Sequence, residues 1–360
     1  MKLDKRKKIV VALIVVILVS IPLIAFLALN QLKNEGPEGL ISADALGRTV
    51  TVDSYSRIVS CAPDITELVC AMGKGANLVG VTTYCDYPQE VVDRKSAGTL
   101  VEIGGYWTPS LESIVEAEPT LILISSGVQA HTDLLPQMES LNLTVVALYP
   151  GKNMTEVAQN IRLMGIMFRD EQKAEEILSE MEEILANIRA ITTVQPVKPK
   201  VLFALWLDPV YTTGGSTYVD EIISMAGGRN VFGDLNGWPQ PSMEQIIEAS
   251  PDVIIVSGTM MMQTPQQIIE GLENDSFWST IPAVQNHRVY VVVNQAENTF
   301  LRQGVRMVEA TQLLAEILYP DEFDVQVPNV IGNEYHEYLK DMTGLGKALV
   351  LRHVISSGGA

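Results

Sequence analysis

The chain is short of positive charge. Its 360 residues include 25 Lys and Arg against 43 Asp and Glu, which gives a formal net charge of −18. Five of the basic residues lie within the first 30 residues, beside a single Asp, so the remainder carries 20 basic against 42 acidic side chains, or −22. A surface of this sign repels a phosphate backbone, and we therefore exclude nucleic-acid binding.

Histidine and cysteine are also scarce. The four histidines lie far apart, and none is grouped with Ser and Asp, or with Cys, at a spacing used in catalysis. A glycine-rich phosphate loop is absent as well. A site for free zinc or manganese needs several His and carboxylates around one ion, and too few His are available. The three cysteines lack CxxC spacing and are predicted to be buried thiols, with a disulfide between Cys61 and Cys85 as the alternative.

A segment that occurs twice organises the rest of the chain. Residues 107–125 and 239–257 share Pro, Ser, Glu, Glu, Ala, Pro and a final Ser at a constant offset, without gaps. In each copy Pro and Ser favour a helix start, apolar residues recur at helical spacing, and a Pro ends the helix. The apolar run that follows suits a strand covered on both faces. Two such units predict two similar lobes with a cleft between them.

The N-terminus holds a long uncharged apolar run. Five basic residues precede the 21 residues Ile9 to Leu29, which at about 1.5 Å per residue span roughly the 30 Å hydrocarbon core of a bilayer. The run exceeds the apolar region of most signal peptides, and neither an Ala-x-Ala site nor a lipid-accepting Cys follows it. We predict an uncleaved membrane anchor with the rest of the chain on the extracytoplasmic side; a cleaved signal is the alternative.

Strands alternate with helices in both halves of the chain, which is typical of parallel sheets flanked by helices. We therefore predict an α/β fold of two similar Rossmann-like lobes. Between them, residues 154–192 contain no Pro and no Gly after Gly165, and their apolar positions follow one face, which predicts a single rigid helix of about 35–38 residues. The predicted division is anchor 1–29, flexible tether 30–44, lobe 1 at 45–152, interlobe helix 153–193, lobe 2 at 198–322, and a C-terminal extension 323–360 that matches no pattern.

Short motifs in a fixed order carry a resemblance to a known family. They are Asp44–Arg48, Arg57–Ser60, Thr66-Glu67, Val79–Val81, Tyr84–Pro88, the two repeat helices, Gly227-Gly228 with Asn230, and Gly304–Arg306. Their order resembles the substrate-binding proteins of ABC importers for cobalamin, ferric siderophores and haem, over about residues 44–320. The resemblance implies a monomer that binds a metal chelate between its lobes and delivers it to a membrane permease with its ATPase. It implies no catalysis and no cofactor; a metal-cluster or chelatase-like enzyme is the remote alternative.

The resemblance also implies where the chelate binds. Such ligands are large and partly flat, so they need aromatic faces and a few hydrogen-bonding groups more than direct metal ligands. Tyr84, Tyr106 and Trp238 match positions that contact the corrin in cobalamin-binding members, so a cobalt corrinoid is the expected ligand, with a ferric siderophore or haem as alternatives. The candidate set is Tyr84, Tyr106, Trp107, Trp206, Tyr211, Trp238, Asn298, Phe300 and Arg302. Packing within the lobes is the alternative role of the aromatics, and Arg306 is expected to stabilise lobe 2.

Glu112 and Glu244 occupy equivalent positions in the first turns of the two repeat helices. Carboxylates there interact favourably with the helix dipole, which is one explanation for their presence. In the resembled family a Glu from each lobe docks onto Arg residues of the permease, and these two residues match that pattern. We expect both carboxylates to be exposed and to fix the docking orientation.

Overall fold

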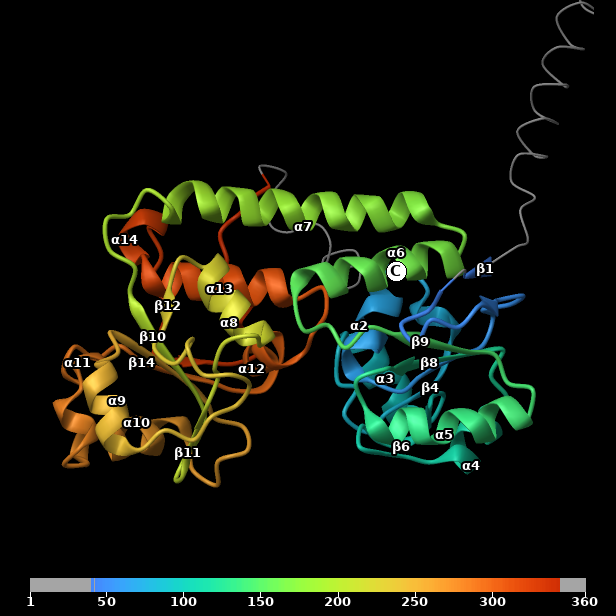
Figure 1. The fold of residues 1–360 in the computed structure, drawn as a ribbon, viewed down its shortest axis with the longest axis horizontal. Coiled ribbons are helices and arrows are strands. Elements are labelled where there is room, and N and C mark those ends of the chain that lie inside the picture. The colour runs from blue at the N-terminus through green and yellow to red at the C-terminus, as the bar shows by residue number, and fades with distance from the viewer. Residues whose placement is uncertain (1–39, 42, 344–360) are drawn as a thin grey trace, which may run out of the picture.

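The computed structural model describes residues 40–343 except residue 42, and these form two α/β lobes on one side of a long helix (Figure 1). The predicted anchor lies outside the described residues. Within the described part of the chain, no helix is both long and apolar enough to cross a membrane.

Lobe 1 is built on a parallel sheet of five strands in the order β5-β4-β3-β8-β9. The strands are β3 (Ile58–Ser60), β4 (Leu78–Val81), β5 (Val101–Glu102), β8 (Leu121–Ser125) and β9 (Val145–Leu148). The helices are α2 (Pro63–Ala71), η1 (Gly75–Asn77), α3 (Gln89–Ser96), α4 (Leu111–Glu116) and α5 (Gln129–Ser140). Two antiparallel pairs join β1 (Leu40–Ile41) to β2 (Val50–Thr51) and β6 (Gly104–Gly105) to β7 (Thr108–Pro109).

Lobe 2 is built on a sheet of six strands in the order β11-β10-β13-β14-β15, with β12 paired to β10; only the β10–β11 pair is antiparallel. The strands are β10 (Lys200–Leu207), β11 (Val210–Thr212), β12 (Arg229–Asn230), β13 (Val253–Ser257), β14 (Val289–Val292) and β15 (Val330–Ile331). The helices are α8 (Tyr218–Met225), α9 (Met243–Ala249), α10 (Pro265–Asn274), η2 (Trp278–Thr280), α11 (Pro282–Gln285), α12 (Asn294–Leu301), α13 (Met307–Leu318), α14 (Pro320–Phe323) and η3 (Tyr335–Glu337).

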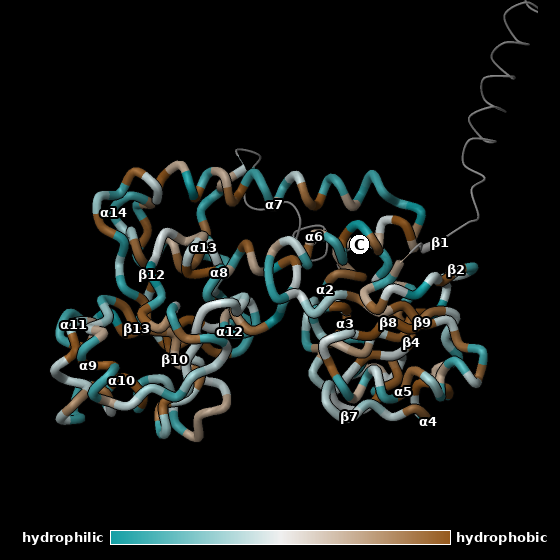
Figure 2. Tube along the Cα trace, viewed as in Figure 1, coloured by the Kyte–Doolittle hydropathy of each residue, from teal (hydrophilic) through white to brown (hydrophobic). Residues whose placement is uncertain are grey.

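The predicted repeat is present in both lobes. Its helices are α4 and α9, and its strands, β8 and β13, are buried at every residue and lie in the interior of their sheets. Figure 2 shows that hydrophobic residues are concentrated in these strands. Helices cover both faces of a parallel sheet, so its inner strands are apolar throughout. A serine caps each helix: Ser110 accepts the N–H of Ser113, and Ser242 that of Gln245. The prediction of one loop–helix–strand unit per lobe is confirmed.

The connection between the lobes differs from the prediction. In place of one helix over residues 154–192, the chain forms two antiparallel helices, α6 (Met154–Met167) and α7 (Glu171–Thr192). The break falls where Arg169 adopts a left-handed φ of 53°. Asp170 then caps α7 by accepting a backbone N–H, so a new helix starts at once. Of the two, α7, with 22 residues and a length of about 33 Å, passes from lobe 1 to lobe 2 (Figure 1).

The two helices pack closely against each other. A Cβ added at Gly165 of α6 would lie 2.8 Å from the Cβ of Ala174 on α7, so the absence of a side chain allows the approach. Gly165 is therefore a contact point between two helices rather than an interior position of one.

The described part of the C-terminal extension belongs to lobe 2, although the sequence pattern places none of it. Strand β15 pairs with β14 at the edge of the sheet. The hydroxyl of buried Tyr335 donates to the Glu309 carboxylate on α13 at 2.5 Å, and the N–H of Lys340 donates to Glu316 at 2.9 Å. Asn187 of α7 donates to the carbonyl of Met342. These contacts fasten the extension to α13 and α7.

The predicted tether extends too far. Strand β1 pairs with β2, and Asp44, assigned to the tether, is buried and accepts hydrogen bonds from the Arg48 guanidinium. The folded part of the chain therefore begins before residue 44.

The cysteines agree with the prediction. All three are buried and free, and within the described residues no Cys61–Cys85 disulfide forms. The sulfur of Cys85 lies 3.2 Å from the hydroxyl oxygens of both Thr66 and Thr82. Burial raises the pKa of the Cys61 thiol to about 12, so this thiol stays protonated at neutral pH.

Candidate ligand-binding site

An aromatic loop between β6 and β7 presents two of the predicted residues on lobe 1. The rings of Tyr106 and Trp107 meet edge to face at 4.6 Å, and the Trp107 side chain is 67% exposed. Tyr84, which follows β4, is 60% exposed, and its ring approaches Gly105 closely enough that an added Cβ would lie 3.4 Å away. The structure therefore brings Tyr84, Tyr106 and Trp107 together at the carboxyl edge of the sheet, where α/β proteins bind ligands.

Buried His131 holds this loop in place. Its Nδ1 accepts the N–H of Ser125 at 3.2 Å, and its Nε2 lies 2.9 Å from the carbonyl oxygen of Tyr106. Since Nδ1 accepts, Nε2 carries the proton and donates to Tyr106. Burial lowers the pKa of His131, which keeps this neutral tautomer at neutral pH. Sequence analysis did not identify this role, because His131 belongs to no recognisable motif.

Lobe 2 contributes a second aromatic pair. The rings of Tyr218, at the start of α8, and half-buried Trp238 meet at 5.7 Å. The Tyr218 hydroxyl donates to the carbonyl oxygen of Leu301 at 3.3 Å. Trp206 and Tyr211 are a separate, exposed cross-strand pair in the β10–β11 hairpin. Tyr218 was not predicted, since its position at a helix start gave no signal beyond helix formation.

Asp64, in the first turn of α2, lies where the two lobes approach each other, since a Cβ added at Gly304 of lobe 2 would lie 3.6 Å from the Asp64 Cβ. Burial and the adjacent charge of Glu67 raise the pKa of Asp64 to about 7. Burial, and after it the charge of Asp64, raises the pKa of Tyr106 on lobe 1. Burial also raises the pKa of Tyr218 on lobe 2 to about 12, and the Asp64 charge adds to this rise.

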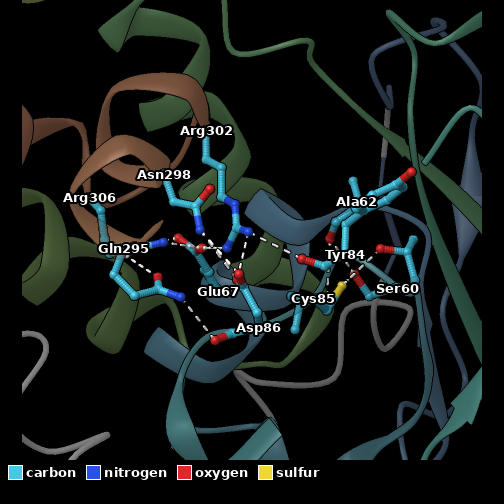
Figure 3. Close-up of polar contacts among 12 residues, drawn as sticks. Ser60, Ala62, Glu67, Tyr84, Cys85, Asp86, Gln295, Asn298, Arg302 and Arg306 are labelled. Carbon is cyan, nitrogen blue, oxygen red and sulfur yellow. Dashed lines mark hydrogen bonds and ion pairs between the residues drawn. The ribbon is translucent and has the colours of Figure 1, made fainter. Parts of the chain in front are cut away.

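A network of ion pairs and hydrogen bonds around Glu67 and Asp86 joins the lobes (Figure 3). Glu67 on α2 accepts from Arg302 at 2.7 Å and from the Arg306 guanidinium at 2.8 and 2.6 Å. Arg302 also donates to the Asp86 carboxylate at 2.6 Å, as does Asn298 at 3.2 Å. Both arginines and Asn298 come from lobe 2, whereas both carboxylates come from lobe 1.

The structure gives partners to the other predicted residues at the junction. Arg302 and Asn298 bond to carboxylates of lobe 1, and their contact with a ligand stays a prediction. Arg306, expected to stabilise lobe 2, is fully buried and joins lobe 2 to lobe 1; its guanidinium also stacks over the Tyr87 ring at 4.1 Å. Phe300 is 0% exposed and packs on Phe203 at 5.6 Å, so its burial argues against a ligand contact.

Glu112 and Glu244 are both exposed, as expected, in the first turns of α4 and α9. The pKa of Glu244 is lowered by hydrogen bonds from its own backbone N–H and from the Ser242 side chain. The two helices lie on different lobes, on the side away from α7 (Figure 1). The described residues contain no group of three or more His, Cys, Asp and Glu able to hold a metal ion.

Two similar α/β lobes with aromatic side chains from both beside their junction define a two-lobed solute-binding protein. Comparison with known proteins agrees. A family model described as periplasmic binding protein matches residues 58–296. An uncharacterized ABC transporter substrate-binding lipoprotein of Bacillus subtilis is 30% identical over 285 residues, 78% of this chain and 85% of that protein. A vitamin B12-binding protein of Photorhabdus laumondii is 29% identical over 265 residues, 73% and 87% of the two chains.

Solved structures show the same architecture. The periplasmic heme-binding protein of Roseiflexus sp. RS-1 in its apo form superposes with a TM-score of 0.64 at 26% identity, over 74% of this chain and 99% of that one. The periplasmic vitamin B12-binding protein of Vibrio cholerae gives a TM-score of 0.58 at 24% identity, over 74% and 97%. The chain belongs to the periplasmic binding protein family, the non-catalytic substrate-binding components of ABC transporters. The resemblance predicted from the motifs is confirmed.

Proposed function

We propose that this chain captures a metal chelate, a cobalt corrinoid before others, between its lobes and delivers it to an ABC permease and its ATPase. One observation carries the proposal: each lobe contributes a pair of contacting aromatic rings, Tyr106 with Trp107 in lobe 1 and Tyr218 with Trp238 in lobe 2. Flat aromatic faces from two sides suit a large, partly planar chelate.

The names of relatives support this class of ligand. Vitamin B12-binding proteins are among both the sequence relatives and the solved structures, which favours the corrinoid. A heme-binding protein has the same fold, so haem is the second candidate, and a ferric siderophore the third.

The remaining candidates have graded roles in this proposal. Tyr84 adjoins the aromatic loop and contacts the chelate. Trp206 and Tyr211 lie in an exposed hairpin and border the site. Arg302 and Asn298 reach a ligand only when Asp86, whose side chain is 49% exposed, releases them.

Delivery uses the exposed carboxylates of Glu112 and Glu244, which provide one acceptor per lobe for guanidinium groups of the permease. The apolar run at 9–29 anchors the chain, and the lobes act on the extracytoplasmic side. This arrangement keeps the binding protein close to its transporter.

The test is a titration of the full chain, in mild detergent, with cyanocobalamin, haemin and a ferric siderophore. Intrinsic tryptophan fluorescence, corrected for ligand absorbance, reports binding. We expect saturable quenching by cyanocobalamin. Trp238→Ala should weaken it about tenfold, since a lost aromatic contact costs about 1.5 kcal/mol.

The matched control is Phe277→Ala, which removes an aromatic ring that is 53% exposed and lies just before η2 in lobe 2. Its affinity should equal that of the wild type. Saturation by haemin or the siderophore alone would move the ligand within the class, whereas no binding of any chelate would refute the proposal.

A further inference from the structure

Donors from lobe 2 hold the segment of lobe 1 that runs from Tyr84 to Asp86 (Figure 3). Gln295 donates to the carbonyl oxygen of Asp86 and Arg302 to that of Tyr84, both at 3.1 Å. The Asp86 carboxylate accepts from Arg302 at 2.6 Å and from Asn298 at 3.2 Å. This carboxylate is therefore the acceptor for donors that all come from α12 and the residue that ends it.

Asp86 borders the exposed aromatic part of the candidate site. Tyr84, two residues before it, is 60% exposed, and a Cβ added at Gly105 of the aromatic loop would lie 3.4 Å from the Tyr84 ring. The side chain of Asp86 is itself 49% exposed. A solute at this face therefore reaches the carboxylate directly.

The two carboxylates of the interlobe network differ in exposure. Glu67 pairs with both Arg302 and Arg306, and its side chain is 1% exposed. Asp86 pairs with Arg302 alone and is half exposed. Among the described residues, no other carboxylate forms an ion pair with either arginine. Asp86 is therefore the anion of this network that an anion from solution can replace.

Such a replacement brings an anionic ligand little gain. A ligand carboxylate bonds to Arg302 only after it displaces Asp86, so one ion pair is exchanged for another, and the displaced carboxylate then repels the ligand. A neutral donor needs no exchange. A carboxylate accepts up to about four hydrogen bonds, so an amide N–H of a ligand can bond to Asp86 while Arg302 and Asn298 stay in place.

We propose that Asp86 determines which chelates the site accepts: its carboxylate occupies Arg302 and Asn298, disfavours chelates that carry carboxylates at their edge, and favours those that carry neutral donors such as amides. This inference rests on the proposed function and deepens it. The edge of a corrinoid carries amides, whereas the edge of haem carries propionates. An internal anion at this position rejects the second kind of ligand by repulsion as well as by the loss of a partner.

The experiment compares chelates that differ in charge but not in their macrocycle. Calorimetric titration of the full chain, in mild detergent, sets cyanocobalamin against its monocarboxylic acids, in which an edge amide has become a carboxylate, and haemin dimethyl ester against haemin. In the wild type we expect the neutral member of each pair to bind more tightly. Asp86→Asn keeps the shape of the side chain and frees Arg302 for a ligand carboxylate. It should reduce the preference about tenfold, as for one charge-assisted hydrogen bond.

Three further variants make the result specific. Asp86→Ser also removes the carboxylate and should act as Asp86→Asn does, so the test does not depend on the folding of one variant. Arg302→Gln added to Asp86→Asn should abolish the gain of the acids, because the cation that binds them is lost. The matched control is Glu139→Gln, at a 53% exposed carboxylate of lobe 1 that pairs with Arg48 at 2.8 Å. It removes the same charge elsewhere and should leave the preference unchanged.

The outcomes separate the two proposals. A wild type without a preference for the neutral member, or Asp86 variants that keep the wild-type preference, overturns the role of Asp86 while the protein remains a chelate binder. Binding of a ferric siderophore alone does the same. A wild type that binds neither these chelates nor a ferric siderophore overturns the proposed function, and the role of Asp86 with it.

Discussion

The two lobes share one repeated unit but complete it with different polar partners. In lobe 1 the repeat strand ends at Ser125, whose N–H donates to His131, and His131 holds the aromatic loop through Tyr106. In lobe 2 the equivalent Ser257 donates its hydroxyl to buried Glu297, which also accepts the N–H of Thr259. The equivalent serine thus bonds to a neutral imidazole in one lobe and to a carboxylate in the other.

The lobes also differ in the charge that they bring to their junction. Lobe 1 supplies carboxylates, Glu67 and Asp86, and lobe 2 supplies guanidinium groups, Arg302 and Arg306. A duplicated fold therefore does not give interchangeable halves. The exposed glutamates that the lobes share lie on α4 and α9, whereas the charged residues that differ face the other lobe.

The largest expected effect tests what the lobes share. Glu112→Ala combined with Glu244→Ala should abolish uptake of labelled cyanocobalamin by cells carrying the transporter, because both lobes lose their acceptor for the permease. Affinity for the chelate should stay that of the wild type. Each single variant should keep partial uptake.

The matched control lies one turn further along the same helices. Glu116→Ala with Glu248→Ala removes the other exposed Glu of each helix, α4 and α9, and should leave uptake intact. If the control pair reduces uptake as much as the first pair does, the docking role of Glu112 and Glu244 is wrong.

The next effect tests what distinguishes the lobes. Glu67→Gln removes the charge that holds Arg306, which is fully buried, and should lower the free energy of unfolding by about 3–5 kcal/mol. Asp86→Asn removes a half-exposed partner of the same network and should cost about 1 kcal/mol or less. Urea denaturation followed by circular dichroism measures both. Equal losses in the two variants would mean that burial of the pair does not govern its contribution.

Local pattern was enough to predict the repeated unit. Its apolar run, Pro boundaries and serine caps act within a few residues of one another, so the interactions that determine this unit are local and can be identified from the sequence. The break at Arg169 lacks such a local signal. The two helices on either side of it pack against each other at Gly165, and this contact exists only in the folded chain. Strand β15, with two residues, is likewise defined by its neighbour β14.

The site was partly predictable for the same reason. Tyr106 matches a motif position of the resembled family, and its ring contacts that of Trp107 in the loop between β6 and β7. Their contact with a ligand stays a prediction. The approach of Gly304 to Asp64 has no signal in the sequence, because it joins residues of different lobes. The ligand contact predicted for Phe300 conflicts with its burial, because an aromatic residue near a loop can as easily pack in the core.

A last effect, smaller than that of Glu67→Gln, concerns the pH dependence of the two lobes. In lobe 2, Glu316 is fully buried; its Oε1 accepts from Gln312 and Lys340, whereas its Oε2 has no hydrogen-bond partner among the described residues. Burial raises the pKa of Glu316 to about 7 from an ordinary 4.5. Between these values the folded protein keeps a proton that the unfolded chain has lost, so this group's contribution to stability falls as pH rises through the window.

We expect Glu316→Gln to remove that slope, because the amide occupies the same space without ionising. The gain relative to the wild type should grow to about 2–3 kcal/mol by neutral pH and vanish near pH 4.5. His131 in lobe 1 acts with the opposite sign, since its lowered pKa makes stability fall as pH drops below the ordinary histidine value of 6.5. Urea denaturation at several pH values tests this, with exposed Glu322→Gln as the matched control. If Glu316→Gln kept the wild-type slope, the buried carboxyl of lobe 2 would not be its source.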